Sequence, residues 1–301
     1  MAIDSSGADR STTIEVPGAH LYYEARGAGP LLLLIPGGPQ DAGVFTDLAG
    51  ELAHSYTVVS YDPRGNSRSP LTGEWTDQDV DLHADDAARL ITAVGMGPAH
   101  VLGTSGGGQI GLSLAARHPE SVRSLLAHEP ACALMLDDPS EALAADHAVY
   151  DTYLRHGVDA AMAKFFRDNA LDDPDSGETA TATATEGEEE GEQEPDALSA
   201  EDVATFERIA GNFEYFLAHG LLPLSTYQPD VARLRNGPVP VVVGLGEDSQ
   251  GQLIDEIGRA LAAALDVTPV IFPGDHVGYG PHAAEFARVV ERVLAESTHP
   301  A

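Results

Sequence analysis

The chain has 301 residues, of which 43% are apolar, so it can bury one large core or a core domain that carries an inserted subdomain. Its 48 Asp and Glu residues outnumber its 16 Lys and Arg residues, and the formal charge of -32 excludes nucleic acid and anionic membranes as favourable partners. One cysteine, Cys132, cannot form an intrachain disulfide, and the N-terminus lacks the basic and apolar regions of a signal peptide, so we expect a cytoplasmic protein.

The first 130 residues alternate short Leu-rich or β-branched runs with amphipathic segments, which is typical of a mostly parallel sheet covered by helices. The pattern resumes near Pro238. The sequence therefore predicts an α/β core built from residues 1–130 and 231–301. The expected strands are 12–16, 20–25, 31–35, 57–61, 99–102, 122–127, 239–243 and 270–272, and the expected helices are 44–54, 79–94, 108–118, 252–265 and 283–296.

The segment between these two parts, 131–230, has a different character. It is helical in spacing, rich in aromatic residues and without a convincing strand, which predicts an inserted helical cap over the sheet. Within it, residues 172–196 hold eleven carboxylates and no Lys or Arg. Such a segment cannot bury enough apolar surface to offset the entropy lost on ordering, so its composition predicts disorder.

The strongest functional pattern is the turn Gly103-Thr104-Ser105-Gly106-Gly107, which follows a short apolar strand and precedes a helical pattern. A sharp strand-to-helix turn pushes its central side chain out of the sheet and leaves no room for Cβ atoms two residues to either side. Ser105 would then lie at a helix N-terminus, where backbone N–H groups stabilise developing negative charge. The pattern predicts Ser105 as a nucleophile. A glycine-rich turn with a bystander serine is the alternative, and the flanking strand and helix disfavour it.

Together with this turn, three further segments resemble the α/β-hydrolase superfamily, in the order found in that family. They are 27–39, which ends in Pro36-Gly37-Gly38-Pro39, 61–69, and 272–276, which ends in Gly-Asp-His. The resemblance implies an α/β-hydrolase fold from the haloperoxidase and epoxide-hydrolase branch, with a cap inserted in the sheet domain.

The resemblance also implies roles for individual residues. Ser105 would attack an acyl carbon, and His276 would take its proton as the general base. The backbone N–H groups of Gly38 and Gly106 would form the oxyanion hole. Pro36 stands where many relatives have a histidine, but the donor is a backbone group, so the hole does not require that side chain.

The acid that would orient His276 has more than one candidate. The position after strand 239–243 is the usual one, but the family's spacing ends on Ser249, so the acid there would be Asp248 or, less favoured, Glu247. The other candidate is Glu129, which follows strand 122–127. Some relatives, among them haloalkane dehalogenases, place their acid there. The sequence alone supports Asp248 and Glu129 almost equally as this acid.

The identity of the nucleophile narrows the chemistry. Epoxide hydrolases and haloalkane dehalogenases use Asp at this turn, whereas an alkyl intermediate on Ser would be an ether that water cannot release. Ser105 therefore favours acyl chemistry on a small, fairly apolar ester or lactone. No cofactor or metal is implied. Aminopeptidase, amidase or perhydrolase activity and a non-catalytic small-ligand receptor or carrier remain as alternatives, and the oligomeric state is open.

Overall fold

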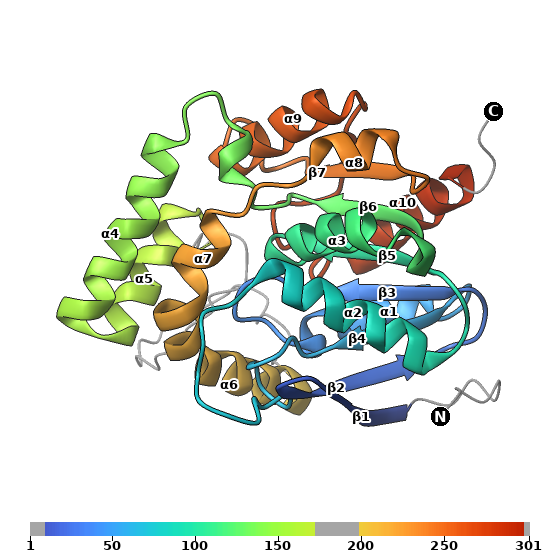
Figure 1. Cartoon of the computed structure of the whole chain (residues 1–301), viewed down its shortest axis with the longest axis horizontal. Helices are drawn as coiled ribbons and strands as arrows, with labels where there is room; N and C mark the ends of the chain where they lie inside the picture. Colours follow the sequence, from blue (N-terminus) through green and yellow to red (C-terminus); the bar gives the residue numbers. More distant parts are fainter. Residues whose placement is uncertain (1–9, 172–198, 298–301) are drawn as a thin grey trace, which may run out of the picture.

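In the computed structural model, residues 10–171 and 199–297 are described, and their eight strands form one sheet in the order β1-β2-β4-β3-β5-β6-β7-β8 (Figure 1). β1 and β2 form an antiparallel hairpin, and β2 pairs antiparallel with β4. All other neighbours are parallel. The strands are β1 (Arg10–Val16), β2 (Ala19–Arg26), β3 (Leu31–Ile35), β4 (Thr57–Tyr61), β5 (Ala99–Thr104), β6 (Val122–His128), β7 (Val241–Gly246) and β8 (Val270–Phe272).

Alternate side chains of the central strand β3 enter two different cores. Leu31, Leu33 and Ile35 belong to one buried apolar cluster, and Leu32 and Leu34 belong to the other. Because successive side chains of a strand point to opposite faces, a strand that is buried on both sides reads as a continuous apolar run. This explains why the sequence around β3 shows no alternation of polar and apolar residues.

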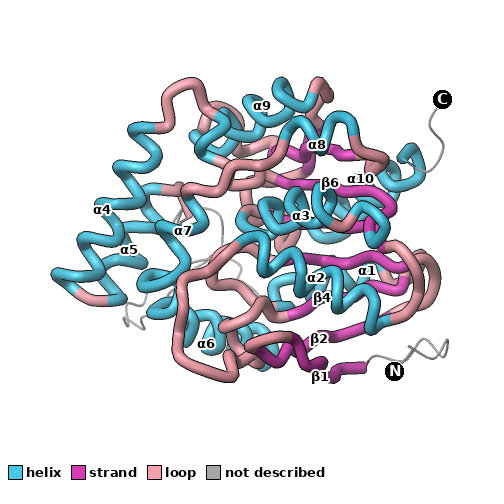
Figure 2. The backbone as a smooth tube through the Cα atoms, viewed as in Figure 1, coloured by secondary structure: helices cyan, strands magenta, loops and turns pink. Residues whose placement is uncertain are grey.

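Helices cover both faces of the sheet, as Figure 2 shows. The larger core lies under α2, α3, α8 and α9, and the smaller one lies under α1 and α10. The mostly parallel sheet flanked by helices that the sequence predicts is therefore confirmed. These helices are α1 (Thr46–Leu52), α2 (Val80–Val94), α3 (Gly106–Arg117), α8 (Val231–Asn236), α9 (Leu253–Leu265) and α10 (Ala283–Ser297), and the short 3-10 helices are η1 (Ala42–Phe45), η2 (Pro119–Ser121) and η3 (Ala133–Met135).

Between β6 and β7 the chain forms a separate group of helices, which we call the inserted helices. They lie together beside the sheet, at the left in Figure 1. No strand occurs in the described part of this segment, 131–171 and 199–230. The acidic run 172–196 lies outside the described residues. The inserted helices are α4 (Ser140–His156), α5 (Val158–Asp168), α6 (Ala200–Tyr215), the π-helix η4 (Phe216–Gly220) and α7 (Leu221–Ser225).

The expected strand ends differ from the observed ones where the chain carries polar residues or glycine. β5 continues to Thr104 and β6 to His128, because these two residues pair with each other across the sheet. β7 begins at Val241 instead of residue 239. Pro240 precedes it and has no N–H for the ladder, although its carbonyl accepts from Leu125 N at 2.9 Å. The extended ends of β5 and β6 lead directly into Ser105 and Glu129.

A buried ion pair joins the loop after β4 to α2. Arg64 donates from Nε and Nη2 to the two carboxylate oxygens of Asp86 at 2.7 and 2.8 Å. The two side chains are only 7% and 1% exposed. A bidentate pair of this kind is strong because both partners are charged and their geometry matches. Removal of one partner would leave the other charge buried and uncompensated.

We therefore expect Asp86→Ala to lower the free energy of unfolding by about 3–5 kcal/mol. Asp151→Ala is the matched control, because Asp151 pairs with Arg155 on the surface of α4, where both side chains are more than half exposed. That change should stay within about 0.5 kcal/mol. Urea unfolding of the two variants and the wild type measures both values. Equal losses in the two variants would contradict the structural role of the buried pair.

Candidate active site

Ser105 lies in a strained turn between β5 and α3. Its backbone has φ 53° and ψ -122°, a conformation that residues other than glycine rarely adopt. A Cβ at Gly103 would collide with the carbonyl of Gly107, and one at Gly107 would collide with the carbonyl of Ile35. Glycine is therefore required on both sides, as the sequence predicts. The Ser105 amide donates to the carbonyl of His128 at 3.0 Å, which ties the turn to the end of β6.

Glu129 and His276 form a hydrogen-bonded pair at the same edge of the sheet. His276 Nδ1 lies 2.8 Å from Glu129 Oε2, and the other carboxylate oxygen accepts from Gly246 N at 2.7 Å. The Glu129 side chain is fully buried and that of His276 is 16% exposed. The Glu129 amide donates to the carbonyl of Gly244 at 2.9 Å, so β7 fixes both ends of this residue.

The electrostatic surroundings keep Glu129 ionised. Burial alone would raise its pKa, but the hydrogen bond to His276, the attraction of that ring and of His128, and the Gly246 N–H outweigh burial and hold the pKa at about 2. Burial lowers the pKa of the neighbouring His128 to about 4, so that ring is neutral at neutral pH and attracts Glu129 only in the acid range where the ring is protonated. The ionised Glu129 carboxylate accepts a hydrogen bond from His276 Nδ1, which favours the tautomer with its proton on Nδ1. Nε2 is then the ring atom that can accept a proton.

The structure separates the two acid candidates that the sequence left nearly equal. Asp248 and Glu247 are both exposed. Their amides donate to the carbonyls of Gly274 and Phe272, so their backbone supports the loop before His276 while their side chains face solvent. Among the described residues, Glu129 supplies the carboxylate within ion-pair distance of the His276 ring. The expectation of a triad acid at Asp248 therefore does not fit the geometry.

Gly37, Gly38 and Gly106 lie close together beside Ser105. A Cβ built on Gly37 would lie 2.6 Å from the Ser105 Cβ, and one built on Gly106 would lie 3.1 Å from the amide nitrogen of Gly38. Gly38 has φ 51°, a conformation suited to glycine. Gly106 is the first residue of α3, so its N–H has no partner within the helix and lies at the positive end of the helix dipole. The structure thus places Gly38 and Gly106 next to each other.

Sequence reasoning missed the side chains that hold the loop carrying Gly38. They include Asn66 on the core and Asn212 on α6, and each donates a hydrogen bond to a carbonyl of residues 38–40. The one available sequence signal for Asn212 is a polar residue among the aromatic side chains of the inserted segment. That signal does not name a partner, because the two contacting segments are more than 140 positions apart in the chain.

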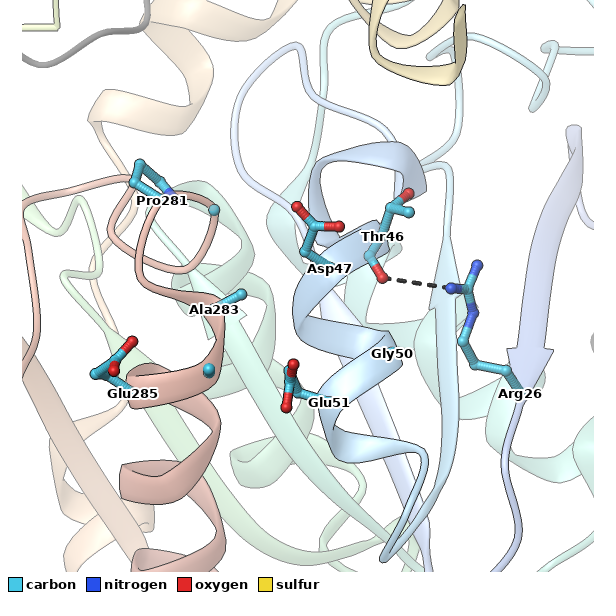
Figure 3. A pocket seen from close by; sticks show the side chains of 10 residues that line it. Arg26, Thr46, Asp47, Gly50, Glu51, Pro281, Ala283 and Glu285 are labelled. Carbon is cyan, nitrogen blue, oxygen red and sulfur yellow. Dashed lines mark hydrogen bonds between the residues drawn. The ribbon is translucent and has the colours of Figure 1, made fainter. Parts of the chain in front are cut away.

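A surface hollow of about 550 Å³ lies elsewhere, between α1 and the start of α10 (Figure 3). Its lining includes Arg26, whose Nη1 donates to the carbonyl of Thr46 at 3.3 Å. Neither Ser105 nor His276 lines it.

Within residues 10–171 and 199–297, no three His, Cys, Asp or Glu side chains are grouped to hold a metal ion, and no helix is long and apolar enough to cross a membrane.

Comparisons with known proteins agree with this architecture. A family described as the alpha/beta hydrolase fold matches residues 30–175. YraK of Bacillus subtilis (strain 168), an uncharacterized hydrolase, is 32% identical over 286 residues, which cover 94% of this chain and 95% of YraK. A thermophilic esterase from Thermogutta terrifontis has a TM-score of 0.72 at 18% identity, covering 96% of this chain and 100% of that one. The enol-lactonase from Burkholderia xenovorans LB400 has a TM-score of 0.67 at 16% identity, with 95% and 100% covered.

The depressed pKa of Glu129 predicts a defined dependence of stability on pH. A carboxyl with a folded-state pKa of about 2 and an ordinary value of 4.5 stabilises the fold above the ordinary value and loses that contribution as pH falls through the folded value. We therefore expect the stability advantage of the wild type over Glu129→Gln to be full above pH 4.5 and to shrink towards pH 2.

Urea unfolding across this range measures that difference. Asp248→Asn is the matched control, because it removes an exposed carboxylate from the same edge of the sheet. Its curve should follow that of the wild type. A wild-type advantage over Glu129→Gln that grows as the pH falls would overturn the assignment of the low pKa to Glu129.

Proposed function

This chain belongs to the α/β hydrolase family and is a hydrolase of that fold, and on that basis we propose that it cleaves a carboxylic ester or lactone through an acyl-enzyme on Ser105. The observation that carries the proposal is the buried hydrogen bond between Glu129 and His276, at the sheet edge where the Ser105 turn also lies. Nucleophile, base and orienting acid are the three parts that serine acyl transfer requires.

The proposed reaction has two steps. His276 Nε2 takes the Ser105 proton while Oγ bonds to the substrate carbonyl carbon, and the oxyanion accepts hydrogen bonds from the Gly38 and Gly106 amides. The bond to the leaving alcohol oxygen then breaks, and that oxygen takes the proton from His276. In the second step His276 takes a proton from a water molecule, whose oxygen bonds to the acyl carbon. The bond from that carbon to Ser105 Oγ then breaks, Oγ takes the proton from His276, and the acid leaves. In a lactone, acid and alcohol leave as one molecule.

The surroundings of Gly38 favour an apolar substrate. The Phe216 ring lies 3.7 Å from the position that a Gly38 Cβ would take. Phe216 contacts Phe165 with ring centroids 5.4 Å apart, and Phe166 packs on Phe213 at 5.9 Å. We propose that the inserted helices form a cap that supplies this aromatic wall to the site. An apolar wall with a few convergent polar groups suits a small, fairly apolar acyl group or lactone ring.

We expect purified protein to hydrolyse p-nitrophenyl esters and simple lactones and to react with a fluorophosphonate probe, and Ser105→Ala to lose both activities. The probe reports the nucleophile and the substrate panel reports the reaction, so each arm has its own readout. Amide and aminoacyl substrates belong in the same panel. Absence of both labelling and turnover would overturn the proposal and favour a non-catalytic ligand binder.

We expect Glu129→Gln to lower kcat by about 10⁴-fold, because a neutral partner no longer holds the imidazole in the required tautomer or stabilises its charged form. Asp248→Asn, the matched control, should leave kcat within about twofold of the wild type, a change worth less than about 0.5 kcal/mol. Steady-state kinetics on one ester substrate measures both. A large loss in Asp248→Asn with none in Glu129→Gln would reverse the assignment of the acid.

A further inference from the structure

One face of α6 runs along the loop that carries Gly38. Thr205, Arg208, Asn212 and Phe216 recur at the spacing of successive helical turns, so they share that face. Phe216 belongs to η4, which continues α6 directly. Each of the four contacts a residue of the segment 38–43, which leads from β3 into η1. An inserted helix, distant in sequence, therefore forms one wall of this loop.

Asn212 makes the most direct of these contacts. Its Nδ2 donates to the carbonyl of Pro39 at 2.8 Å, and Pro39 directly follows Gly38. The same nitrogen donates to Ser67 Oγ at 2.8 Å, and Oδ1 accepts from Ser67 N at 2.7 Å. The side chain is buried, with 4% exposed. A buried amide with this many partners is held in one orientation, so the position of the Pro39 carbonyl is fixed with it.

The core holds the same loop from the other side. Asn66 is 1% exposed, and its Nδ2 donates to the carbonyls of Gly38 and Gln40 at 3.1 and 3.0 Å. The carbonyls of three consecutive residues are thus held alternately by the core and by α6. The Pro39 carbonyl shares a peptide plane with Gln40 N, which donates to the carbonyl of Gly37 at 3.0 Å, and that carbonyl shares a peptide plane with the Gly38 N–H. Holding the Pro39 carbonyl therefore restrains the plane that carries the Gly38 N–H.

An ion pair strengthens the junction one turn along α6. Arg208 donates from Nε to Asp41 Oδ2 at 2.6 Å, and the Asp41 side chain is fully buried. A Cβ on Gly43 would collide with the Thr205 hydroxyl, so α6 also lies tight against the start of η1. This helical face thus contacts the loop at residues 39, 41 and 43, and Phe216 lies beside residue 38.

We propose that Asn212 is a positioning residue for the oxyanion hole, which α6 completes by holding the Pro39 carbonyl so that the Gly38 N–H points at the oxyanion. The inference rests on the proposed acyl-transfer function, and Asn212 itself touches neither the substrate nor Ser105. Hydrogen-bond donors stabilise a transition state only when they are fixed in place before the charge develops. The oxyanion hole is then complete only when the inserted helix α6 is in place.

The test compares four purified variants on one ester substrate. Asn212→Leu keeps the approximate size of the side chain and removes its hydrogen bonds. Asn212→Ser shortens the side chain so that it no longer reaches Pro39, and it keeps a polar group in case the first variant does not fold. Ser67→Ala removes the bond between Ser67 Oγ and Asn212 but leaves the bond to Pro39. Asn236→Leu is the surface control, because Asn236 is exposed and donates within α8 to the carbonyl of Ala232.

The readouts are kcat, KM, melting temperature and the inhibition constant of phenylboronic acid, which forms a tetrahedral adduct on a serine nucleophile. In Asn212→Leu or Asn212→Ser we expect kcat to fall about 10- to 100-fold, and boronate binding to weaken by a similar factor, while KM changes less than about threefold. Ser67→Ala and Asn236→Leu should lose less than about threefold in kcat, about 0.7 kcal/mol at most.

A folded Asn212 variant with unchanged kcat and boronate affinity would overturn the inference while an active wild type upholds the proposed function. An Asn212 variant with a lower melting temperature or a changed KM, but with unchanged kcat and boronate affinity, would also overturn the inference. That result would show that Asn212 only stabilises the fold or the substrate site and does not position the Gly38 N–H. A wild type without turnover on the whole panel would overturn the proposed function, and the inference with it.

Discussion

The carboxylate of Glu129 sets the arrangement of the whole sheet edge. A fully buried charge is costly unless each oxygen has a partner, and here one oxygen bonds to His276 and the other to Gly246 N. Both partners depend on the sheet. Gly246 is the last residue of β7, and His276 follows β8, the neighbouring strand. A loss of register between β6, β7 and β8 would therefore leave the carboxylate unpaired, so the fold and the proposed site stabilise each other.

The two sides of the proposed site have different origins. Glu129, His276 and the Ser105 turn belong to elements that pair or follow each other within one sheet. The loop that carries Gly38 depends on Asn66 from the core and on the α6 face from the inserted helices. Acyl transfer needs both sides at once, since the base acts on the nucleophile while the hole receives the charge. In the proposed mechanism, the aromatic wall can change only within limits, because the same inserted segment also holds the loop of the proposed oxyanion hole.

The fold was predictable because its signals are local. The bounds of β3, β4 and β8 agree with the expected strands, since apolar runs between turn residues define them, and the glycines around Ser105 revealed the strand-to-helix turn. The acid was not predictable from local pattern, since Asp248 and Glu129 both follow core strands. Burial and strand pairing, which no spacing rule contains, separate them. The role of Asn212 could not be predicted for the same reason, because it depends on contacts with Pro39 and Ser67, which are far away in the chain.

Backbone strain marks the same residues independently. Among the described residues, five that are not glycine have positive φ, and three of these are Ser67, Ser105 and Glu129. Such conformations cost about 1–3 kcal/mol each and persist only where the surroundings hold them. Ser67 bonds to both the oxygen and the nitrogen of the Asn212 side-chain amide. The backbone N–H groups of Ser105 and Glu129 donate to the carbonyls of His128 and Gly244, respectively. Ser105 and Glu129 follow two adjacent strands, and Ser67 is the partner of Asn212. Strain at these three residues is expected if their side chains were selected for their placement at the expense of local stability. The residue that Asn212 holds and two residues of the proposed triad thus share the same kind of backbone strain.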